Sequence, residues 1–265
     1  MGEITDVLKL ATALKECSQT PRLDARFFYE HYSNHPTQAQ TSEFIQRRKA
    51  GEPVAKILGK RGFWKRDFRV SSDVLDPRPD TETLIETVLR FYPEQTEPYR
   101  ILDIGTGSGC ILLSLLGEYP NAGGIGVEKS LSALKIAQEN NGENTDHRAE
   151  FCQADFTDDD FGNRLGAFDI IVSNPPYIPT NDIDTLEKSV KCYDPLIALD
   201  GGYDGLDAYR HIAQRVSALI KEDGLIFLEI VRRQENDVVQ FMKWHQLTCR
   251  ERVQALGGIM RVLVF

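Results

Sequence analysis

The chain has 265 residues, 41% of them hydrophobic and 27% charged, which is typical of a globular protein with a sizeable core. Its 40 acidic and 31 basic residues give a net charge of −9. This balance argues against tight, unspecific binding to nucleic acid, which depends on neutralising many phosphates. Apolar runs stay well short of the roughly 18 residues that a membrane-spanning helix needs.

The first residues, MGEITDVLKL, carry acidic rather than basic groups, so we expect neither a secretory signal nor a transit peptide. Five cysteines are scattered and form no CxxC pair. That pattern argues against a disulfide framework or a zinc site and fits a reducing compartment. We therefore predict a cytoplasmic protein with no bound metal and no contact with membranes.

Residues 1 to about 50 have helical hydrophobic spacing, as in TDVLKLATALKE, PRLDARFFYEHY and TSEFIQRRKAGEP. Residues 62–75 then alternate aromatic or β-branched side chains with charged ones, which predicts a β-hairpin or an extended connector. The rigid turn DPRPD follows, and Thr81 opens a further helix. We expect a helical domain over residues 1–72, a linker to about 76, and a second domain over 77–265.

From residue 99 strands and helices alternate, which predicts a doubly wound parallel α/β sheet. The expected strands are YRILDIG, GGIGVE, AEFCQAD, FDIIVS and LIFLEIV. A long helix is expected over 205–224, GLDAYRHIAQRVSALIKEDG, closed by Gly224. HQLTCRERV and IMRVLVF have no helix between them, so we expect a closing antiparallel hairpin.

A glycine-rich loop connects the first of these strands to its helix. In LDIGTGSGC, Asp103 precedes the loop, whose residues are Gly105, Thr106, Gly107, Ser108 and Gly109. Glycines let the backbone adopt positive φ and approach a ligand closely, but a GxGxG pattern alone also occurs in phosphate sites and structural turns. Asp103 would repel a pyrophosphate and attract an ammonium group.

Acidic residues also end the next two strands. Glu128 can accept hydrogen bonds from both ribose hydroxyls, as in dinucleotide-binding folds. Asp155 can accept from an adenine amino group, and the ring of Phe156 can cover the base. A nucleoside with a cationic amino-acid tail satisfies these groups, and S-adenosylmethionine is such a ligand. The alternatives are a surface carboxylate at Asp103 and a structural role for Glu128.

The fourth strand ends in Asn174, Pro175, Pro176 and Tyr177, the NPPY segment. Ligands of open α/β sheets bind at the carboxyl ends of strands where the strand order reverses, so this segment should face the glycine loop. The side-chain oxygen of Asn174 and the carbonyl of Pro175 could accept both N–H bonds of a planar amino group and direct its lone pair at a methyl carbon. Tyr177 could pack on that planar group. A simple turn that ends the strand is the alternative.

Several motifs together resemble the release factor glutamine N5-methyltransferase family. They are GEPVAKILGKRGFWKRDFRV, VLDPRPDTETLIE, LDIGTGSG, SNPPYIP, KCYDPLIALDGGYDGLDAYRHI and GGIMRVLVF, in this order over nearly the whole chain. NPPY alone is shared with methyltransferases that act on amino groups of DNA and RNA, whereas the PRPDTE and ALDGGYDGLDAYR segments are more specific.

The resemblance implies a seven-stranded Rossmann-like methyltransferase sheet and an N-terminal helical domain that binds class I peptide chain release factors. It implies methyl transfer from S-adenosylmethionine, which leaves as S-adenosylhomocysteine, to the glutamine of the GGQ motif, supporting translation termination. Residues 105–109, Glu128, Phe156 and Asn174 would bind the donor, and residues 174–177 the glutamine. Arg78 and Thr81 would lie near the methionine end of the donor, although a structural salt bridge is an alternative for Arg78.

The chain departs from the family pattern at four places. Glu128 replaces a more common Asp, and Phe156 stands where many relatives have Trp. LEIVRRQ has Val231 where a glycine is usual, which puts the shape of that loop in question. Lys56 stands where relatives often have Tyr, which predicts altered contacts with the release factor.

Three other functions compete with this interpretation. An exocyclic-amine DNA or RNA methyltransferase would share the NPPY segment, but the acidic charge and the lack of a large basic segment count against it. A binding module without turnover would not need both the glycine loop and NPPY. A dinucleotide-dependent dehydrogenase would explain the glycine loop and leave NPPY unexplained.

Overall fold

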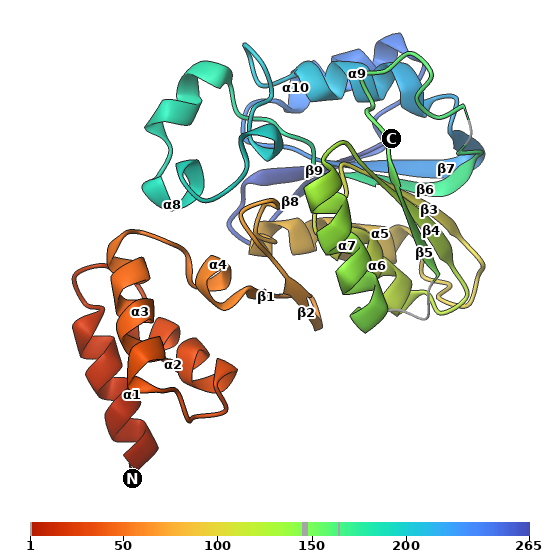
Figure 1. Ribbon diagram of the computed structural model, residues 1–265. Coiled ribbons are helices and arrows are strands. Elements are labelled where there is room, and N and C mark those ends of the chain that lie inside the picture. Colours follow the sequence, from red (N-terminus) through yellow and green to blue (C-terminus); the bar gives the residue numbers. More distant parts are fainter. Residues whose placement is uncertain (1, 145–147, 164) are drawn as a thin grey trace.

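The computed structural model describes residues 2–144, 148–163 and 165–265, and within these residues one seven-stranded sheet forms the centre of the molecule (Figure 1). The strand order across the sheet is β5-β4-β3-β6-β7-β9-β8. The strands are β3 (Arg100–Ile104), β4 (Gly123–Glu128), β5 (Ala149–Gln153), β6 (Phe168–Ser173), β7 (Ile220–Glu229), β8 (Glu251–Gln254) and β9 (Met260–Val264). The predicted doubly wound architecture is confirmed.

Strand pairing sets the position of the reversal in strand order. β3 runs parallel to β4 on one side and to β6 on the other, with Ile101 opposite Ile170 and Ile104 opposite Ser173. β9 is antiparallel to both β7 and β8, as the predicted closing hairpin requires. The chain therefore leaves β3 toward β4 and β5 and returns on the other side at β6, which creates a crevice at the carboxyl ends of β3 and β6.

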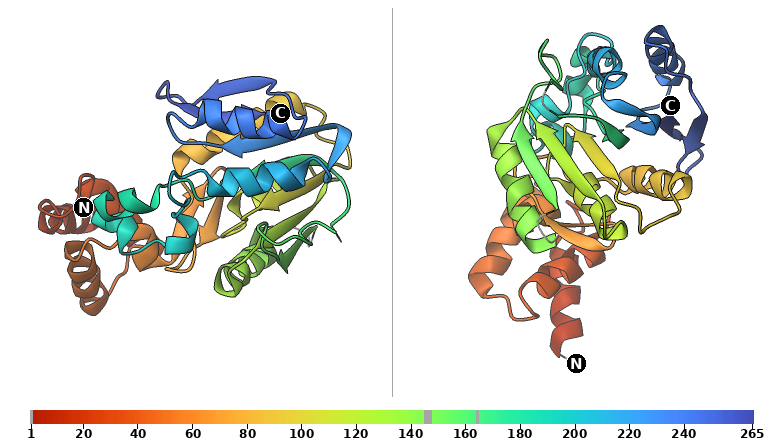
Figure 2. Two further views of the ribbon diagram at one scale, coloured as in Figure 1. Left: turned by 90° about the horizontal axis from the view of Figure 1, so that it is seen from above. Right: turned by 90° about the vertical axis from the view of Figure 1, so that its right-hand side faces the viewer.

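Side chains of the central strands alternate between two hydrophobic cores, as expected for a sheet covered on both faces. On β7, Leu225 and Phe227 belong to one core, whereas Ile226 and Leu228 belong to the other. The first core is covered by α5 (Glu82–Phe91) and α6 (Cys110–Glu118), with α7 (Leu131–Asn144) beside α6. The second is covered by α9 (Asp207–Val216) and α10 (Glu235–Trp244), and Figures 1 and 2 show the two helical layers on opposite faces.

The N-terminal helices have a core of their own and lie to one side of the sheet (Figures 1 and 2). They are α1 (Gly2–Ala13), α2 (Pro21–His31), α3 (Gln38–Lys49) and the short α4 (Val54–Leu58). Leu14, Phe28 and Phe44 are fully buried among them. A separate core is what the predicted helical domain needs, and the boundary near residue 72 stays a prediction.

A hairpin connects these helices to the sheet. β1 (Lys60–Phe63) and β2 (Arg66–Arg69) pair antiparallel, two residues earlier than the predicted start. Phe63 and Phe68 are buried in the core that α5 and α6 cover. The indole N–H of Trp64 donates to Glu118 at 2.7 Å, which ties the turn of the hairpin to the end of α6. The chain then continues through the 3-10 turn η1 (Pro79–Thr81) into α5.

The helix predicted over residues 205–224 is wrong in its second half. α9 ends at Val216, and the chain is already in β7 at Ile220. Ile220 pairs with Phe168 of β6, and Phe168 N–H donates to the carbonyl of Leu219 at 2.8 Å. Gly224 therefore lies inside a ten-residue strand. Pairing with β6 overrides the local helical preference of this segment.

Two further parts of the fold, α10 and the segment between β6 and α9, were not expected from the sequence. Val238 and Met242, one helical turn apart, are buried on α10. Residues 174–206 connect β6 to α9, and this long connection contains η2 (Thr180–Thr185), α8 (Lys188–Lys191) and η3 (Leu196–Ala198). Within the residues that the structure describes, no helix has the length and apolar character needed to cross a membrane.

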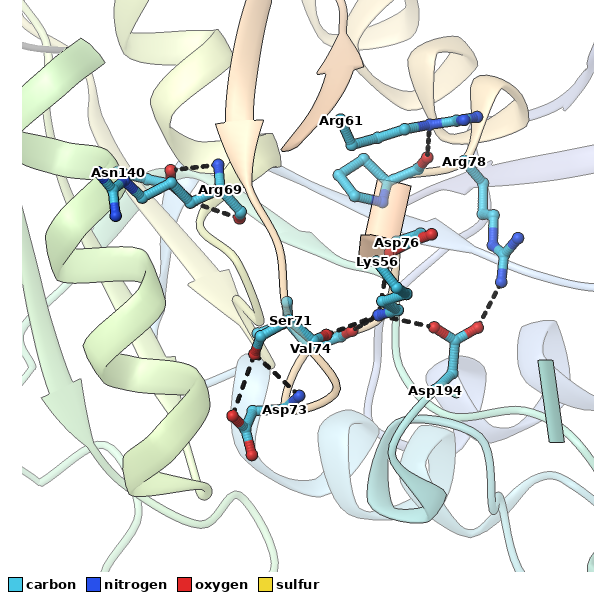
Figure 3. Close-up of polar contacts among 11 residues, drawn as sticks. Lys56, Arg61, Arg69, Ser71, Asp73, Val74, Asp76, Arg78, Asn140 and Asp194 are labelled. Atoms are coloured by element: carbon cyan, nitrogen blue, oxygen red, sulfur yellow. Dashed lines mark hydrogen bonds and ion pairs between the residues drawn. The ribbon is translucent and has the colours of Figure 1, made fainter. Parts of the chain in front are cut away.

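One buried amide joins the hairpin to the glycine loop. Asn140 of α7 accepts from the N–H of Arg69 at 2.7 Å and donates to the Arg69 carbonyl at 3.1 Å (Figure 3). It also donates to the carbonyl of Ser108 at 2.9 Å. The side chain is completely buried, so these backbone groups have little access to water.

We expect Asn140→Ala to lower the free energy of unfolding by about 3 kcal/mol, because each buried polar group left without a partner costs about 1–3 kcal/mol. Urea unfolding measures the change. Asn121→Ala is the matched control, because Asn121 donates to the Thr96 carbonyl at an exposed site, and it should cost less than about 1 kcal/mol. Equal losses in the two variants would contradict the role given to Asn140.

Candidate active site

A cavity of about 350 Å³ opens at the carboxyl ends of the parallel strands, where the strand order reverses. We call it the first cavity. Its walls include Gly105, Thr106, Gly107 and Ser108 after β3, Glu128 at the end of β4, Asp155 and Phe156 after β5, and Asn174 and Pro176 after β6. Segments that are far apart in the sequence thus meet around one space, as the sequence analysis predicted for the glycine loop and NPPY.

The three glycines of the loop differ in what surrounds them and in whether they line the cavity. All three have positive φ, at 73°, 56° and 79° for Gly105, Gly107 and Gly109. A Cβ on Gly105 or Gly107 would meet nothing within 4 Å, so the backbone on that side is open. A Cβ on Gly109 would lie 3.2 Å from the ring of Phe151, and Gly109 is not among the cavity walls. Gly109 serves helix packing rather than the cavity.

Asp103 lies behind the glycine loop rather than on the cavity wall. Its side chain is completely buried, and one carboxylate oxygen accepts from the Thr106 hydroxyl at 2.6 Å. The other oxygen is buried without a hydrogen-bond partner. Burial raises the pKa of Asp103 to about 7. Direct contact of Asp103 with an ammonium group, as predicted, does not agree with this burial, and the geometry gives Asp103 a part in holding the loop.

Glu128 shapes the loop and also faces the cavity. One of its carboxylate oxygens accepts from the N–H of Gly107 at 3.0 Å, and the other accepts from the N–H of Ser130 at 2.9 Å. Ser130 directly precedes α7, so the carboxylate also joins the loop to the start of that helix. Each oxygen retains a lone pair for a hydroxyl donor in the cavity.

Asp155 and Phe156 line the first cavity after β5, the strand that pairs with β4 next to Glu128. Asp155 accepts from the backbone N–H and the hydroxyl of Thr157 at 2.9 and 2.7 Å, and it pairs with Lys129 at 2.7 Å. Burial acts to raise the pKa of Asp155, but the hydrogen bonds from Lys129 and Thr157 outweigh it and hold the pKa below its ordinary value. The carboxyl group is therefore ionised and accepts hydrogen bonds near neutral pH.

The residues of the NPPY segment are divided between the first cavity and a second one. Asn174 Nδ2 donates to the Thr81 hydroxyl at 3.3 Å, which leaves the amide oxygen as a free acceptor. Asn174 lines both cavities, Pro176 lines the first and Tyr177 the second. Pro175 is buried and lines neither. Burial raises the pKa of Tyr177 to about 12, so its phenol stays protonated.

The second cavity, of about 420 Å³, holds charged residues that the sequence analysis did not assign to the site. Glu229, at the end of β7, is 1% exposed and has one carboxylate oxygen without a hydrogen-bond partner. Burial raises the pKa of Glu229 to about 7. Arg261 lies nearby and pairs with Asp80 at 2.6 Å. The sequence did contain a signal for Glu229, because it is an acidic residue at the end of a parallel strand, as Glu128 is.

The LEIVRRQ loop keeps a link to the NPPY segment despite its unusual sequence. Gln234 Nε2 donates to the carbonyls of Tyr177 and Gly205, each at 3.0 Å. Positive φ occurs at Arg233, 77°, and not at Val231, the position at which the resemblance led us to expect glycine. The loop therefore supports Tyr177 through Gln234.

Comparison with known proteins identifies the family. A family model described as a methyltransferase domain matches residues 95–256. The chain is 44% identical over 231 residues to a release factor glutamine methyltransferase of Rhodospirillum rubrum, covering 86% of this chain and 69% of that protein. A protein of the same name from Agrobacterium fabrum is 42% identical over 240 residues, covering 89% and 82%.

The chain belongs to the release factor glutamine methyltransferase family. It is an enzyme that transfers methyl groups. The crystal structure of a methyltransferase from Pyrococcus furiosus superposes with a TM-score of 0.54 at 17% identity, covering 86% of this chain and 96% of that one, and shows the same fold. Among the residues that the structure describes, no group of three or more His, Cys, Asp or Glu side chains is arranged to hold a metal ion.

Because the pKa of the buried carboxyl group of Asp103 is raised, its contribution to the free energy of unfolding depends on pH. Its pKa is about 7 in the folded chain and about 3.9 in the unfolded chain. Between these values the unfolded chain is ionised while the folded chain keeps the proton, so stability falls as pH rises, by about 1.4 kcal/mol per pH unit. Asp103→Asn removes this contribution.

We therefore expect the stability of the wild type relative to Asp103→Asn to fall between about pH 4 and 7 and to level off above it. Chemical unfolding at several pH values measures the difference. Asp67→Asn, in the exposed hairpin, should show no such fall. A difference for Asp103→Asn that does not change with pH would show that the carboxyl group is already ionised in the fold.

Proposed function

We propose that the protein transfers a methyl group from S-adenosylmethionine to the side-chain amide nitrogen, N5, of the glutamine in the GGQ motif of class I peptide chain release factors. The observation that carries the proposal is the position of Asn174, whose amide lies on the wall shared by the two cavities. One cavity contains the glycine loop and suits a methyl donor, and the other contains Tyr177 and suits a glutamine side chain.

The donor would occupy the first cavity. The open backbone at Gly105 and Gly107 supports close contact with the amino-acid end, and Glu128 supports binding of the ribose hydroxyls. Asp155 and Phe156 would hold the adenine amino group and cover the ring. Thr106, Ser108 and Asn174 complete the contacts, while Asp103 and Gly109 act from behind the loop. When bound, S-adenosylmethionine supplies an activated methyl group and leaves as S-adenosylhomocysteine.

The NPPY residues would orient the glutamine amide. Its nitrogen lone pair is delocalised and weakly nucleophilic, so both N–H bonds must be held while the lone pair faces the methyl carbon. The oxygen of Asn174 would accept one N–H, because Thr81 engages the amide nitrogen of Asn174. Although the ring of Pro175 lines neither cavity, its backbone carbonyl lies between Asn174 and Pro176 on the wall of the first cavity and would accept the other, and Pro176 fixes its direction. These acceptors also stabilise the positive charge that develops on nitrogen.

The second cavity would receive the glutamine side chain, with the ring of Tyr177 against the planar amide. Because the phenol of Tyr177 stays protonated, it is not the base, and the proton of the product leaves to water. The helical domain, residues 1–72, would grip the release factor. The exposed side chains of Leu8, Leu23 and Phe27 on α1 and α2 support this role, because they offer apolar contacts to a protein partner. The reaction would take place in the cytoplasm.

The deciding experiment incubates the full chain with S-adenosylmethionine carrying a labelled methyl group and a purified release factor, and maps the modified residue by mass spectrometry. We expect one methyl group on the GGQ glutamine. An oligonucleotide arm tests the DNA or RNA alternative, which the net charge of −9 disfavours. Label on the oligonucleotide, or on another release factor residue, would contradict the proposal.

Asn174→Ala should lower kcat by about a hundredfold or more, since it removes a hydrogen-bond acceptor aimed at developing charge. Binding of S-adenosylhomocysteine should change much less. Asn236→Ala is the matched control, since Asn236 accepts from Arg252 at an exposed site. Normal turnover in Asn174→Ala would remove the amide from the mechanism.

Glu128→Gln should weaken the binding of S-adenosylhomocysteine by about tenfold to a hundredfold, because hydrogen bonds to a charged group contribute about 1.5–3 kcal/mol. The Gln side chain keeps the size of the original and one acceptor for the loop, so the fold should persist. Calorimetry measures the affinity, with Glu150→Gln on the exposed side of β5 as the control. Equal affinities in the two variants would argue against ribose binding by Glu128.

A further inference from the structure

A buried ionic cluster joins the helical domain to the walls of the first cavity (Figure 3). Lys56 of α4 lies with its Nζ atom 2.9 Å from Oδ1 of Asp76 and 3.0 Å from Oδ1 of Asp194. The other oxygen of Asp194 accepts from Arg78 Nη2 at 2.6 Å. The cluster therefore contains two cations and two carboxylates.

Lys56 is the centre of this cluster and is deeply buried. Its side chain is 3% exposed, and its hydrogen bonds go to the backbone carbonyls of Ser71, at 2.7 Å, and Val74. The two carboxylates contact the ammonium as ion pairs. Lys56 is thus too deeply buried to contact a release factor directly, and the expectation that contacts with the release factor differ from those of relatives stays a prediction. A charge in such a position is tolerated only when it is well paired.

The buried carboxylate of Asp194 is paired with both cations of the cluster, Lys56 and Arg78. Its side chain is 1% exposed, and burial raises its pKa even though Lys56 and Arg78 both act to lower it. Removing Lys56 would leave Arg78 as the remaining partner of Asp194 in the cluster. It would also leave Asp76, on the wall of the first cavity, without its cation.

Arg78 is the accessible member of the cluster. Its side chain is 38% exposed, and it lines both cavities beside Asn174. Asp194 engages Nη2, so the donors on Nη1 and Nε remain for a second acceptor. Six residues on the walls of the first cavity are acidic, against one arginine, Arg78, and one lysine, Lys129, which is paired with Asp155 after β5. An anionic group at the Asn174 end of the cavity would therefore need Arg78.

We propose that Lys56 is a positioning residue for methyl-donor binding: by neutralising Asp76 and Asp194, it leaves the positive charge of Arg78 available for the carboxylate of the donor's amino-acid end. This inference rests on the proposed function only in taking S-adenosylmethionine as the donor. With Lys56 present the cluster is neutral, and without it the cluster has an excess negative charge that repels a carboxylate. Because Lys56 belongs to α4, donor affinity depends on a residue of the helical domain.

Two ligands separate this electrostatic role from a purely structural one. S-adenosylhomocysteine carries the carboxylate, whereas 5′-methylthioadenosine has the nucleoside and sulfur but lacks the amino-acid end. Calorimetry with the full chain gives the affinity for each. We expect Lys56→Met to weaken binding of S-adenosylhomocysteine about tenfold or more, and to change binding of methylthioadenosine less than about twofold. Lys60→Met, at an exposed hairpin position, is the matched control and should alter neither.

A second variant is expected to change the affinity for S-adenosylhomocysteine in the opposite direction. Asp194→Asn removes the carboxylate that competes for Arg78, while Lys56 keeps its pair with Asp76. We expect this variant to bind S-adenosylhomocysteine several-fold more tightly than the wild type, with methylthioadenosine unchanged. It also provides the test if Lys56→Met does not fold. A merely structural cluster would instead lose affinity in both variants.

The inference is overturned if Lys56→Met weakens both ligands equally, or if Asp194→Asn weakens S-adenosylhomocysteine. A wild-type protein that binds neither ligand would overturn this inference together with the proposed donor. A wild-type protein that binds S-adenosylhomocysteine but does not methylate the release factor would overturn the proposed function alone. The binding differences between the variants would still support the role of Lys56.

Discussion

The parallel pairing of β3 with β6 is the constraint on which the site depends. It places the loop after Ile104 next to the segment after Ser173, although the two strands are separated by two complete strand-and-helix units. The glycine loop and Asn174 reach the same cavity only because these strands are neighbours with their carboxyl ends aligned. A shift of one residue in this register would turn the adjoining side chains to the other face.

Polar groups near the carboxyl ends of the parallel strands are largely buried, and each is held by a hydrogen bond to a specific partner. Thr106 donates to Asp103, Thr81 accepts from Asn174, and Gln234 donates to the carbonyl of Tyr177. Each contact fixes a group to which the proposed function gives a part in binding or transfer. Asp103 and Glu229 each keep a buried carboxylate oxygen without a hydrogen-bond partner, and both have raised pKa values, so the site contains acids that stay partly protonated near neutral pH.

The helical domain is tied to the catalytic sheet through its linker as well as through the chain. The hairpin places Phe63 and Phe68 in the core under α5 and α6, and Asn140 holds the end of β2 against α7. Beyond the hairpin, the backbone carbonyls of Ser71 and Val74 accept hydrogen bonds from Lys56, and residues 73–78 line the first cavity. A partner that binds the N-terminal helices would therefore act on a structure that is continuous with the proposed donor site.

The sequence by itself determined the local features: the alternation of strands and helices, the hairpin, the glycine loop, and the polar residues that end β4, β5 and β6. Each of these is recorded in short-range spacing or in residue types with strong conformational preferences. The strand over residues 220–224 was not predictable in this way, because its conformation comes from pairing with Phe168. Only the tertiary structure decided the burial of Asp103, the second cavity with Glu229, and the cluster around Lys56. Arg78 and Asp194 are 116 positions apart. An ion pair between residues so far apart produces no local sequence pattern, so it could not be predicted from the spacing of residue types.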